Sequence, residues 1–239
     1  MYTLQLFSVR DAMGQDLRKA LKSVAALGYQ RVEFAGFFGI EPEALRDWLD
    51  ESALGVFGSH MPCDTIEDDF DAVVQYHHAI GCERITINRN QLYSQEAIDA
   101  FVAQANRLRL KLLGEGIRLG FHNHHQEFET NFDGSIAYPS ILERTELDLQ
   151  LDVFWSRVAG HDPVAQIETF GKRLQSIHLK DGLLDGTELP FGQGEMQLPT
   201  IARKANELAI DIIAESETLN PSGLAEAKIC IEYLKNLES

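Results

Sequence analysis

The feature of this chain that most constrains its fold is a regular alternation that runs from one end to the other. Short apolar or β-branched runs, each about as long as a strand, are separated by longer segments with apolar residues at helical spacing. The expected strands are Thr3–Val9, Arg31–Ala35, Gly55–His60, Arg84–Asn88, Arg118–Asn123, Leu147–Asp152, Leu174–Leu179 and Asp211–Glu215. Strands that alternate with helices in this way predict a parallel sheet.

We expect that sheet to close on itself. Gly28, Gly81 and Gly116 each stand just before an expected strand, where helices commonly end in a left-handed residue. No linker or change in composition divides the 239 residues, so residues 1–239 are expected to form one domain. Eight βα units close most economically as a (β/α)8 TIM barrel, usually of about 250 residues. An open doubly wound sheet is the alternative, but the first turn, Ser8–Asp11, lacks the Gly-rich phosphate loop of such sheets.

Charge and cysteine usage restrict the class of protein. The chain has 37 Asp plus Glu against 21 Lys plus Arg, a formal charge of -16, which repels nucleic acid. The basic run Arg107–Lys111 lies in a helical pattern and is interpreted as a solvated face. Three scattered cysteines indicate a reducing compartment. With no secretory signal and no apolar stretch of about 18 residues, we expect a cytoplasmic protein without a membrane partner, which can form a homo-oligomer.

Polar residues gather where the expected strands end, and in a barrel the chemistry lies at the carboxyl ends of the strands. The residues at or just past those ends are His60, Asn88, His122, Asn123, His124, His125, Glu127, Asp152, His178, Lys180, Asp181, Glu215 and Glu217. Gln5 and Glu33 occupy weaker positions on the first two strands. The amino ends of the same strands are mostly Gly, Arg or Leu, so the polar residues predict a functional mouth.

Three of these residues predict a metal site. Asp152 closes an apolar strand, where an unpaired carboxylate is costly and needs a cation. The alternative is a structural ion pair with a lysine. His178 and Glu215 also end apolar strands, and each alone fits a hydrogen-bonded core residue. Together they match one divalent ion such as Mn²⁺, Mg²⁺, Co²⁺ or Zn²⁺.

The fifth strand offers more than one possible metal ligand. In GFHNHHQEFE, side chains alternate along the strand, so His122 and His124 share one face while Asn123 and His125 share the other. We expect Glu127, just past the strand, to be the metal ligand, with His122 and His124 contacting substrate. His122 as the ligand, with Glu127 turned outward, is the competing interpretation. A polar loop with chance histidines is a third.

Several segments together resemble a known family. LQLFSVRD, GYQRVEFAG, GFHNHHQEFE, LDVFWSRVAGHDP, IHLKDG and FGQGEM are similar, in order and spacing, to blocks of the sugar phosphate isomerase/epimerase group. This group belongs to the xylose-isomerase-like (AP endonuclease 2-like) barrels. The resemblance implies a metal held by an acidic residue on strand five and by Asp152, His178 and Glu215. Many members have Glu-Asn on strand five where this chain has His122-Asn123, and we expect Glu127 to substitute.

The expected reaction is proton abstraction beside a carbonyl. A metal polarises the substrate oxygens and stabilises an enediolate, while a carboxylate or His moves the proton. We expect Glu127 and Glu215 to be catalytic and Lys180 to stabilise the oxyanion, although Lys180 could instead pair with Asp152. The residues expected to contact a sugar or polyol substrate are His60, Asn88, His122, His124 and Trp155.

These residues predict an isomerase or epimerase of carbohydrate metabolism acting on a keto-sugar or related polyol. A lyase or dehydratase on a keto-glycoside or keto-inositol uses the same enediolate. An abasic-site endonuclease needs a basic groove, which the acidic charge disfavours, and a non-catalytic sugar-binding barrel leaves the metal cluster without a role.

The substrate is expected to be unphosphorylated. A phosphate calls for paired cations or a Gly-rich turn at a helix start. The candidate cations Arg10, Arg89, Arg157 and Lys180 are instead scattered over four loops. Phe37, Phe38 and Trp155 are expected to pack on a sugar face, and the alternative is that each belongs to the apolar core.

Overall fold

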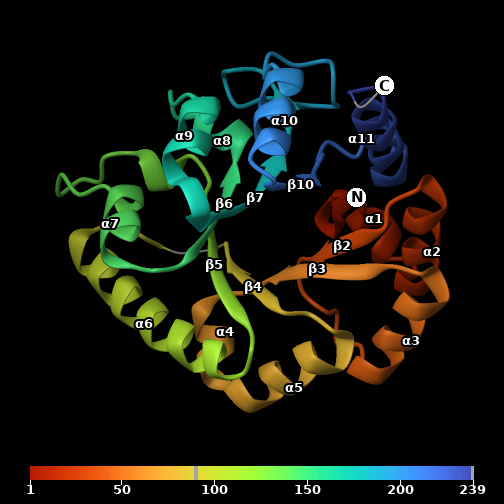
Figure 1. Ribbon diagram of the computed structural model, residues 1–239, viewed down its shortest axis with the longest axis horizontal. Helices are drawn as coiled ribbons and strands as arrows, with labels where there is room; N and C mark the ends of the chain where they lie inside the picture. The colour runs from red at the N-terminus through yellow and green to blue at the C-terminus, as the bar shows by residue number, and fades with distance from the viewer. Residues whose placement is uncertain (89–90, 238–239) are drawn as a thin grey trace.

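A computed structural model describes residues 1–88 and 91–237, and its strands close into a barrel surrounded by helices (Figure 1). The strands follow one another as β1, β2, β3, β4, β5, β6, β7 and β10, with β10 pairing back to β1, and every neighbouring pair is parallel. Their bounds are Thr3–Gln5, Arg31–Phe34, Gly55–His60, Arg84–Ile87, Arg118–His122, Asp148–Asp152, Leu174–Leu179 and Asp211–Ala214. The predicted (β/α)8 barrel is confirmed, and the open sheet is wrong.

Helices cover the outside of the barrel, and one small hairpin interrupts the pattern. The α-helices are α1 (Arg10–Met13), α2 (Leu17–Leu27), α3 (Pro42–Ser52), α4 (Cys63–Asp68), α5 (Phe70–Ile80), α6 (Gln95–Gly114), α7 (Ala137–Arg144), α8 (Val153–Val158), α9 (Pro163–Phe170), α10 (Leu198–Glu207) and α11 (Gly223–Leu237). Single 3-10 turns are η1 (Leu6–Val9), η2 (Gln126–Phe128) and η3 (Gly171–Arg173). The hairpin consists of β8 (Asp181–Gly182) and β9 (Glu188–Leu189), which pair antiparallel.

The expected strand bounds differ most at the first strand. Thr3–Val9 was expected, but β1 ends at Gln5 and the chain continues as η1. The cause is local, because the side-chain oxygen of Gln5 accepts a hydrogen bond from the amide of Phe7 at 3.2 Å and caps the turn. The last strand ends one residue before Glu215, which leaves that side chain just past the barrel rim.

The apolar core lies between the barrel and its helices, while the inside of the barrel is polar. On β2, Val32 and Phe34 are fully buried in the apolar cluster that includes Leu21 of α2 and Leu45 of α3. Glu33 stands between them in sequence and is fully buried too, but it points to the other side of the strand, toward the barrel axis. The strand period therefore brings a carboxylate into the centre of the molecule.

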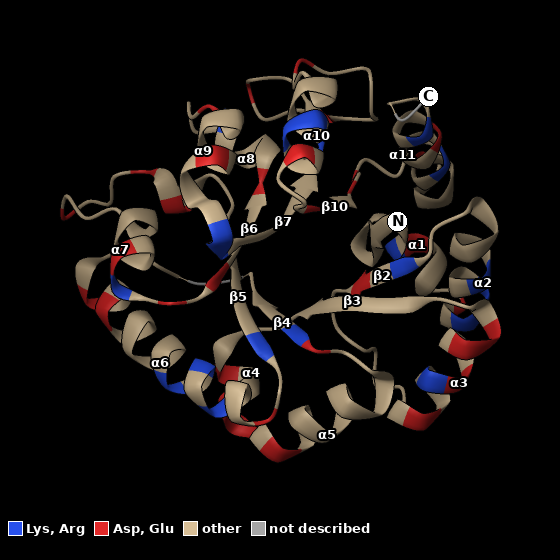
Figure 2. Cartoon of the chain, viewed as in Figure 1, with Lys and Arg blue, Asp and Glu red and all other residues tan. Residues whose placement is uncertain are grey.

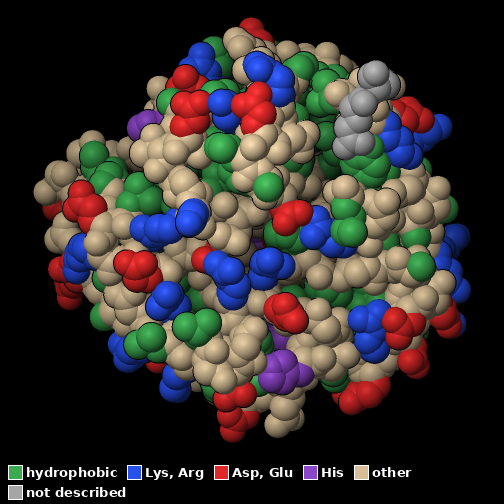
Figure 3. Space-filling view, viewed as in Figure 1, with side chains coloured by type: hydrophobic (Ala, Val, Ile, Leu, Met, Phe, Trp, Pro, Cys, Tyr) green, Lys and Arg blue, Asp and Glu red, His purple; other side chains and the backbone are tan. Residues whose placement is uncertain are grey.

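Acidic and basic residues are mixed along the outer helices. Figure 2 shows Asp and Glu positions and Lys and Arg positions on several of these helices. On the face seen in Figure 3, Lys and Arg are interspersed with Asp and Glu, and no continuous basic surface is visible there. Within residues 1–88 and 91–237, no helix has both the length and the apolar character required for a membrane span.

Candidate metal centre

The lower part of the site is a network built around Glu33. Its carboxylate accepts hydrogen bonds from the side-chain amides of Gln5 at 2.8 Å and Gln150 at 2.7 Å. Nε2 of His178 lies 2.6 Å away and Nε2 of His60 lies 3.2 Å away. Burial raises the pKa of Glu33, but the nearby His60 and His178 outweigh burial and hold the pKa well below its ordinary value. This carboxylate is therefore ionised and fully partnered.

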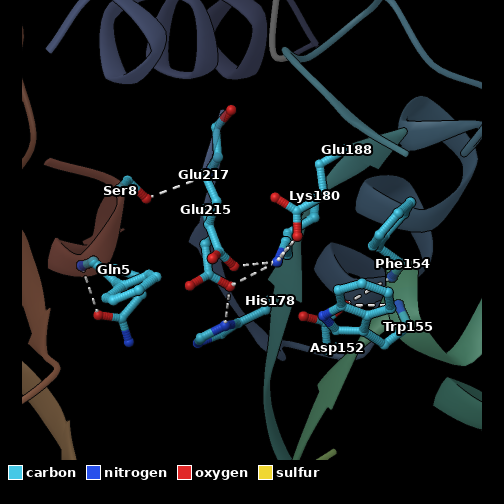
Figure 4. A network of polar contacts seen from close by, with 12 residues as sticks. Gln5, Ser8, Asp152, Phe154, Trp155, His178, Lys180, Glu188, Glu215 and Glu217 are labelled. Carbon is cyan, nitrogen blue, oxygen red and sulfur yellow. Dashed lines mark hydrogen bonds and ion pairs between the residues drawn. The ribbon is translucent and has the colours of Figure 1, made fainter. Parts of the chain in front are cut away.

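Above this network, the three carboxyl-end residues of the last strands converge. Asp152 ends β6, His178 lies on β7, and Glu215 follows β10. One ligand atom from each lies within 4.8 Å of the other two, and all three side chains are buried. Figure 4 shows them pointing toward one another, with His178 Nδ1 2.8 Å from Glu215 Oε2. The structure thus brings together the three residues that the sequence suggested as ligands.

Asp152 is the residue of this group that has one carboxylate oxygen without a hydrogen bond to any described residue. Its Oδ1 accepts hydrogen bonds from the amides of Phe154 at 2.9 Å and Trp155 at 3.0 Å, at the start of α8. Its Oδ2 is buried and has no hydrogen bond with any described residue. Burial raises the pKa of Asp152 from 3.8 to about 7, although Lys180 opposes the shift. A buried oxygen without a donor, beside an imidazole and a second carboxylate, fits a divalent cation.

His178 and Glu215 form a charged pair beside that oxygen. Burial lowers the pKa of His178, but Glu215 and Glu33 outweigh it and raise the pKa from 6.5 to about 10. Burial raises the pKa of Glu215, while Lys180 and His178 together lower it to about 2. A metal ion bound through His178 therefore has to displace a firmly held proton.

Lys180 lies in a cage of carboxylates at the edge of the cluster. Its Nζ donates to Glu217 and, at 3.1 Å, to Glu188, and lies 3.7 Å from Glu215 (Figure 4). Burial lowers the pKa of Lys180, but Glu215 and the other surrounding carboxylates raise it above its usual range. The ring of Trp155 lies 5.3 Å from the same ammonium group. Lys180 is therefore a protonated donor.

A hairpin that the sequence did not predict delivers Glu188 to this cage. Asp181 is buried, and its two oxygens accept hydrogen bonds from the amides of Gly182, Gly192, Gly194 and Met196. A Cβ on Gly194 would lie 2.2 Å from Asp181 Oδ1, so only glycine fits there. Asp181 thus fixes the loop that carries Glu188, which explains the glycines of FGQGEM.

The cluster opens into a cavity of about 440 Å³, the metal cavity. All five residues expected to contact substrate line it: His60, Asn88, His122, His124 and Trp155. Asp152, Lys180, Glu188, Glu215 and Glu217 line it as well. His178 lies beneath, fully buried. Their roles toward a substrate stay predictions, but their common position is a fact of the fold.

Two aromatic residues are placed differently from the expectation. Phe37 stacks on Tyr76 with ring centroids 4.2 Å apart, and packs against the apolar core. Phe38 is exposed, and neither residue lines the metal cavity. Phe37 therefore takes the alternative position in the core, and Phe38 is on the surface outside this cavity. Phe7 lines the cavity instead, since η1 follows the short first strand.

On the fifth strand, the structure does not bring Glu127 into the cluster. Glu127 lies in η2, where its Oε2 accepts a hydrogen bond from the amide of His124 at 2.8 Å. It lines a neighbouring cavity instead of the metal cavity. Burial raises its pKa. Glu127 therefore lies outside the cluster in this structure, because its carboxylate accepts a hydrogen bond from the local backbone, and its role as a ligand stays a prediction.

His122 occupies the place that Glu127 was expected to fill. Its Nδ1 lies 3.1 Å from the side-chain oxygen of Gln150, and its Nε2 lies 3.9 Å from the unpartnered Oδ2 of Asp152. Burial and the neighbouring His178 and His60 lower its pKa well below 6.5, so the ring is neutral. With Nδ1–H donating to Gln150, the lone pair of Nε2 faces Asp152, as in a metal-ligating imidazole. The geometry favours the competing interpretation.

Comparison with known proteins agrees with this architecture. A family model described as a xylose isomerase-like TIM barrel matches residues 21–237. Among solved structures, a sugar phosphate isomerase/epimerase from Parabacteroides distasonis is 21% identical, with a TM-score of 0.85, covering 98% of this chain and 93% of that chain. An L-ribulose 3-epimerase is 14% identical, with a TM-score of 0.75 and coverage of 99% and 93%.

A third structure carries a different activity on the same fold. A probable 3-DHS dehydratase from Bacillus anthracis is 13% identical, with a TM-score of 0.75 and coverage of 97% and 98%. At such identities the likeness concerns the fold alone. No curated protein matches the chain.

Proposed function

Since this chain belongs to the xylose isomerase-like TIM barrel family, we propose that its single domain is a divalent-metal-dependent isomerase or epimerase. The substrate is an unphosphorylated keto-sugar or related polyol, and the reaction passes through an enediolate. Two observations carry the proposal: Oδ2 of Asp152 is buried without a hydrogen bond to any described residue, and one carboxylate oxygen of Asp152 lies within 4.8 Å of ligand atoms of His178 and Glu215. Protein interiors do not leave a carboxylate oxygen unpaired without a reason.

The metal-binding residues are Asp152, His178 and Glu215, with His122 as the donor from strand five. Two carboxylates and two imidazoles suit Mn²⁺, Co²⁺ or Zn²⁺ better than an all-oxygen site would, and Mg²⁺ is the least favoured of the four. When bound, such an ion supplies Lewis-acid polarisation of a substrate carbonyl. Gln150 orients His122 from behind, through the contact between its side-chain oxygen and Nδ1.

The remaining cavity residues provide the proton chemistry. Glu215 is ionised and lines the metal cavity, so it is available to take the proton from the carbon beside the carbonyl. Lys180 stays protonated and donates to the substrate oxygen that gains negative charge. Trp155 offers an aromatic face at the wall of the cavity, where a sugar ring can pack.

The charges around the cavity support an unphosphorylated substrate. Among its described lining residues, Lys180 is the one Lys or Arg, and three carboxylates already surround it. Arg10 donates to the backbone oxygens of Phe7 and Glu217, and Arg157 lines a different cavity. Arg89, the fourth candidate, lies outside the described residues. A phosphate would meet mainly acidic groups here.

A lyase or dehydratase is the second candidate, and the position of Glu127 favours it over a two-carboxylate epimerase. Epimerisation needs proton donors on both faces of the substrate. Glu127 does not line the metal cavity, and the fifth-strand segment contributes the imidazoles of His122 and His124 to its described lining. One carboxylate with a protonated Lys180 is sufficient for isomerisation or for elimination from an enediolate.

The direct test is solvent exchange at carbon. The purified protein is analysed for bound metal, loaded with Mn²⁺, and incubated in D₂O with unphosphorylated ketoses, keto-inositols and their phosphorylated counterparts. We expect deuterium at the carbon beside the carbonyl of an unphosphorylated substrate, followed by NMR. Asp152→Asn should abolish it, whereas Asp148→Asn, at the amino end of the same strand, should retain it.

Two results would contradict the proposal. Exchange with phosphorylated sugars alone would overturn the substrate class. No exchange with any sugar, together with cleavage of abasic DNA, would overturn the enzymatic assignment.

A further inference from the structure

We propose that Glu226 is a positioning residue, which fixes the loop after β10 so that Glu217 holds the ammonium group of Lys180 at the wall of the metal cavity. Glu226 lies on α11, is fully buried and is not among the residues that line this cavity. The inference rests on the proposed function, in which Lys180 donates to the substrate. It adds a residue that acts on this donor without touching it.

Three donors of the loop converge on the carboxylate of Glu226. Its Oε2 accepts a hydrogen bond from Oγ of Ser216 at 2.6 Å. Its Oε1 accepts hydrogen bonds from Oγ1 of Thr218 and, at 2.6 Å, from the backbone amide of Asn220. Glu217 lies between the first two of these residues in the sequence. One buried carboxylate therefore fixes the loop on both sides of Glu217.

The turn after β1 holds the same loop by its backbone. Oγ of Ser8 accepts a hydrogen bond from the amide of Ser216 at 3.2 Å (Figure 4). The guanidinium group of Arg10 donates to the backbone oxygen of Glu217 at 2.8 Å. Both residues belong to the segment LQLFSVRD, for which the metal cluster gives no role. Together with Glu226, they leave the side chain of Glu217 as the part of this residue that is free to extend into the cavity.

Glu217 is one of two carboxylates that orient Lys180. Nζ of Lys180 donates to Glu217 from the loop after β10 and, at 3.1 Å, to Glu188 from β9 (Figure 4). An ammonium group has three N–H donors. With two of them directed at Glu217 and Glu188, the third remains for Glu215, 3.7 Å away, or for a substrate oxygen in the cavity. If Glu217 moved, one fixed donor would be released and the ammonium group would turn.

Two variants of Glu226 separate its hydrogen bonds from its charge. Glu226→Ala removes both acceptor atoms. Glu226→Gln can keep all three contacts, because its amide oxygen replaces Oε1 and its amide nitrogen donates to the hydroxyl of Ser216, which also accepts. Glu232→Ala, exposed on the same helix, is the matched control. Thr218→Val removes a single donor of the loop and is the milder variant if Glu226→Ala does not fold.

The first readout needs no substrate. An ammonium group that is buried and hydrogen-bonded exchanges its protons slowly, so Lys180, whose side chain is 2% exposed, should give a ¹H–¹⁵N NMR signal in the protein as purified. The loss of this signal in Lys180→Arg identifies it. We expect the signal to persist in Glu226→Gln and Glu232→Ala, to disappear in Glu226→Ala and to weaken in Thr218→Val.

The second readout is deuterium exchange into fructose in D₂O with Mn²⁺. We expect Glu226→Ala to lower kcat by about 10–100-fold with KM within about threefold, because the misplaced donor acts on the charge that develops during the reaction. Glu226→Gln should stay within about threefold of wild type. If Glu226 acts through Glu217, the variant that combines Glu226→Ala with Glu217→Gln should be no slower than Glu217→Gln alone.

The two readouts separate this inference from the proposed function. If the wild type exchanges neither fructose nor any other ketose, but the Lys180 signal responds to the variants as described, the positioning role stands and the proposed reaction is wrong. The positioning role is wrong if the wild type gives no Lys180 signal, or if Glu226→Ala and Thr218→Val leave it unchanged. It is also wrong if Glu226→Gln is as damaging as Glu226→Ala, or if the losses from Glu226→Ala and Glu217→Gln multiply in the combined variant.

Discussion

Two fully buried carboxylates lie in the same barrel and meet opposite conditions. Glu33 has partners on both oxygens and a pKa held below its ordinary value. Asp152 has one oxygen that accepts hydrogen bonds from two amides, one oxygen that receives none from the described residues, and a pKa raised to about 7. Burial alone therefore does not fix the pKa of a carboxylate in this barrel. The two residues differ in whether described residues pair with both carboxylate oxygens, and we propose that a metal ion pairs with the remaining oxygen of Asp152.

The largest expected effect comes from changing Glu33, the carboxylate whose two oxygens both have hydrogen-bond partners. Glu33→Gln removes the charge that faces His178 and His60 while keeping the volume of the side chain. We expect a loss of about 3–5 kcal/mol in the free energy of unfolding, because a buried imidazolium loses its counter-ion. Urea denaturation of the metal-free protein measures it. A loss below about 1 kcal/mol would show that the Glu33 network is not a structural unit.

A second prediction sharpens the assignment on the fifth strand. His122→Ala should weaken Mn²⁺ binding by about 10–100-fold, because it removes the imidazole that faces Asp152. Glu127→Ala should leave Mn²⁺ affinity within about twofold. Isothermal titration of Mn²⁺ into both variants decides between the two residues. The reverse order of effects would restore Glu127 as the ligand.

The third prediction concerns the pH dependence of the metal-free fold. The pKa of His178 is raised to about 10, so its contribution is complete below pH 6.5 and is lost as the pH rises toward 10. The raised pKa of Asp152 acts in the same direction between pH 4 and 7, because the folded form holds a proton that the unfolded form has released. Stability should fall from pH 6 to pH 8.5, by at most about 1.4 kcal/mol per pH unit for each group.

Mn²⁺ should oppose this trend, since it pairs with Asp152 and displaces the proton of His178. The stabilisation by saturating Mn²⁺, measured as the difference between denaturation curves with metal and with chelator, should therefore grow with pH. A constant difference between pH 6 and pH 8.5 would mean that the metal does not bind through these groups.

The sequence and the structure agree where periodicity decides the outcome. The eight strand runs predicted the barrel, and the direction of the strands predicted that Asp152, His178 and Glu215 lie close together, although their role as metal ligands stays a prediction. Both predictions depend only on the two-residue alternation of side chains along a strand and on the common direction of parallel strands. Both of these can be inferred from the amino-acid sequence.

The sequence was weaker where a side chain's partners come from distant strands. Glu33 was a minor candidate and Gln150 none, although each occupies an alternate position in an otherwise apolar strand, which is the available signal. Their importance depends on contacts across the barrel, 117 residues apart in sequence. Glu188 contacts Lys180 because of a hairpin that Asp181 stabilises, and no periodic pattern in the sequence predicts this hairpin.

The position of Glu127 outside the cluster has a local cause. Its spacing from the strand allows the carboxylate to return to the mouth, but the chain enters a 3-10 turn and the carboxylate binds the amide of His124. The direction of the Glu127 carboxylate depends on the backbone conformation of the turn Gln126–Phe128, and the spacing of residues in the sequence does not determine that conformation.

The central claim is that the unpartnered oxygen of Asp152 belongs to a metal site, and metal titration of two variants tests it most directly. Wild-type protein stripped with chelator should bind one Mn²⁺ per chain, with Asp148→Asn unchanged and Asp152→Asn at least about 100-fold weaker. At 100 times its dissociation constant, Mn²⁺ should also stabilise the wild-type fold by about 2.7 kcal/mol and leave the Asp152→Asn fold unaffected. If none of Mn²⁺, Mg²⁺, Co²⁺ or Zn²⁺ binds to the wild type, or if Asp152→Asn binds equally well, the claim is contradicted.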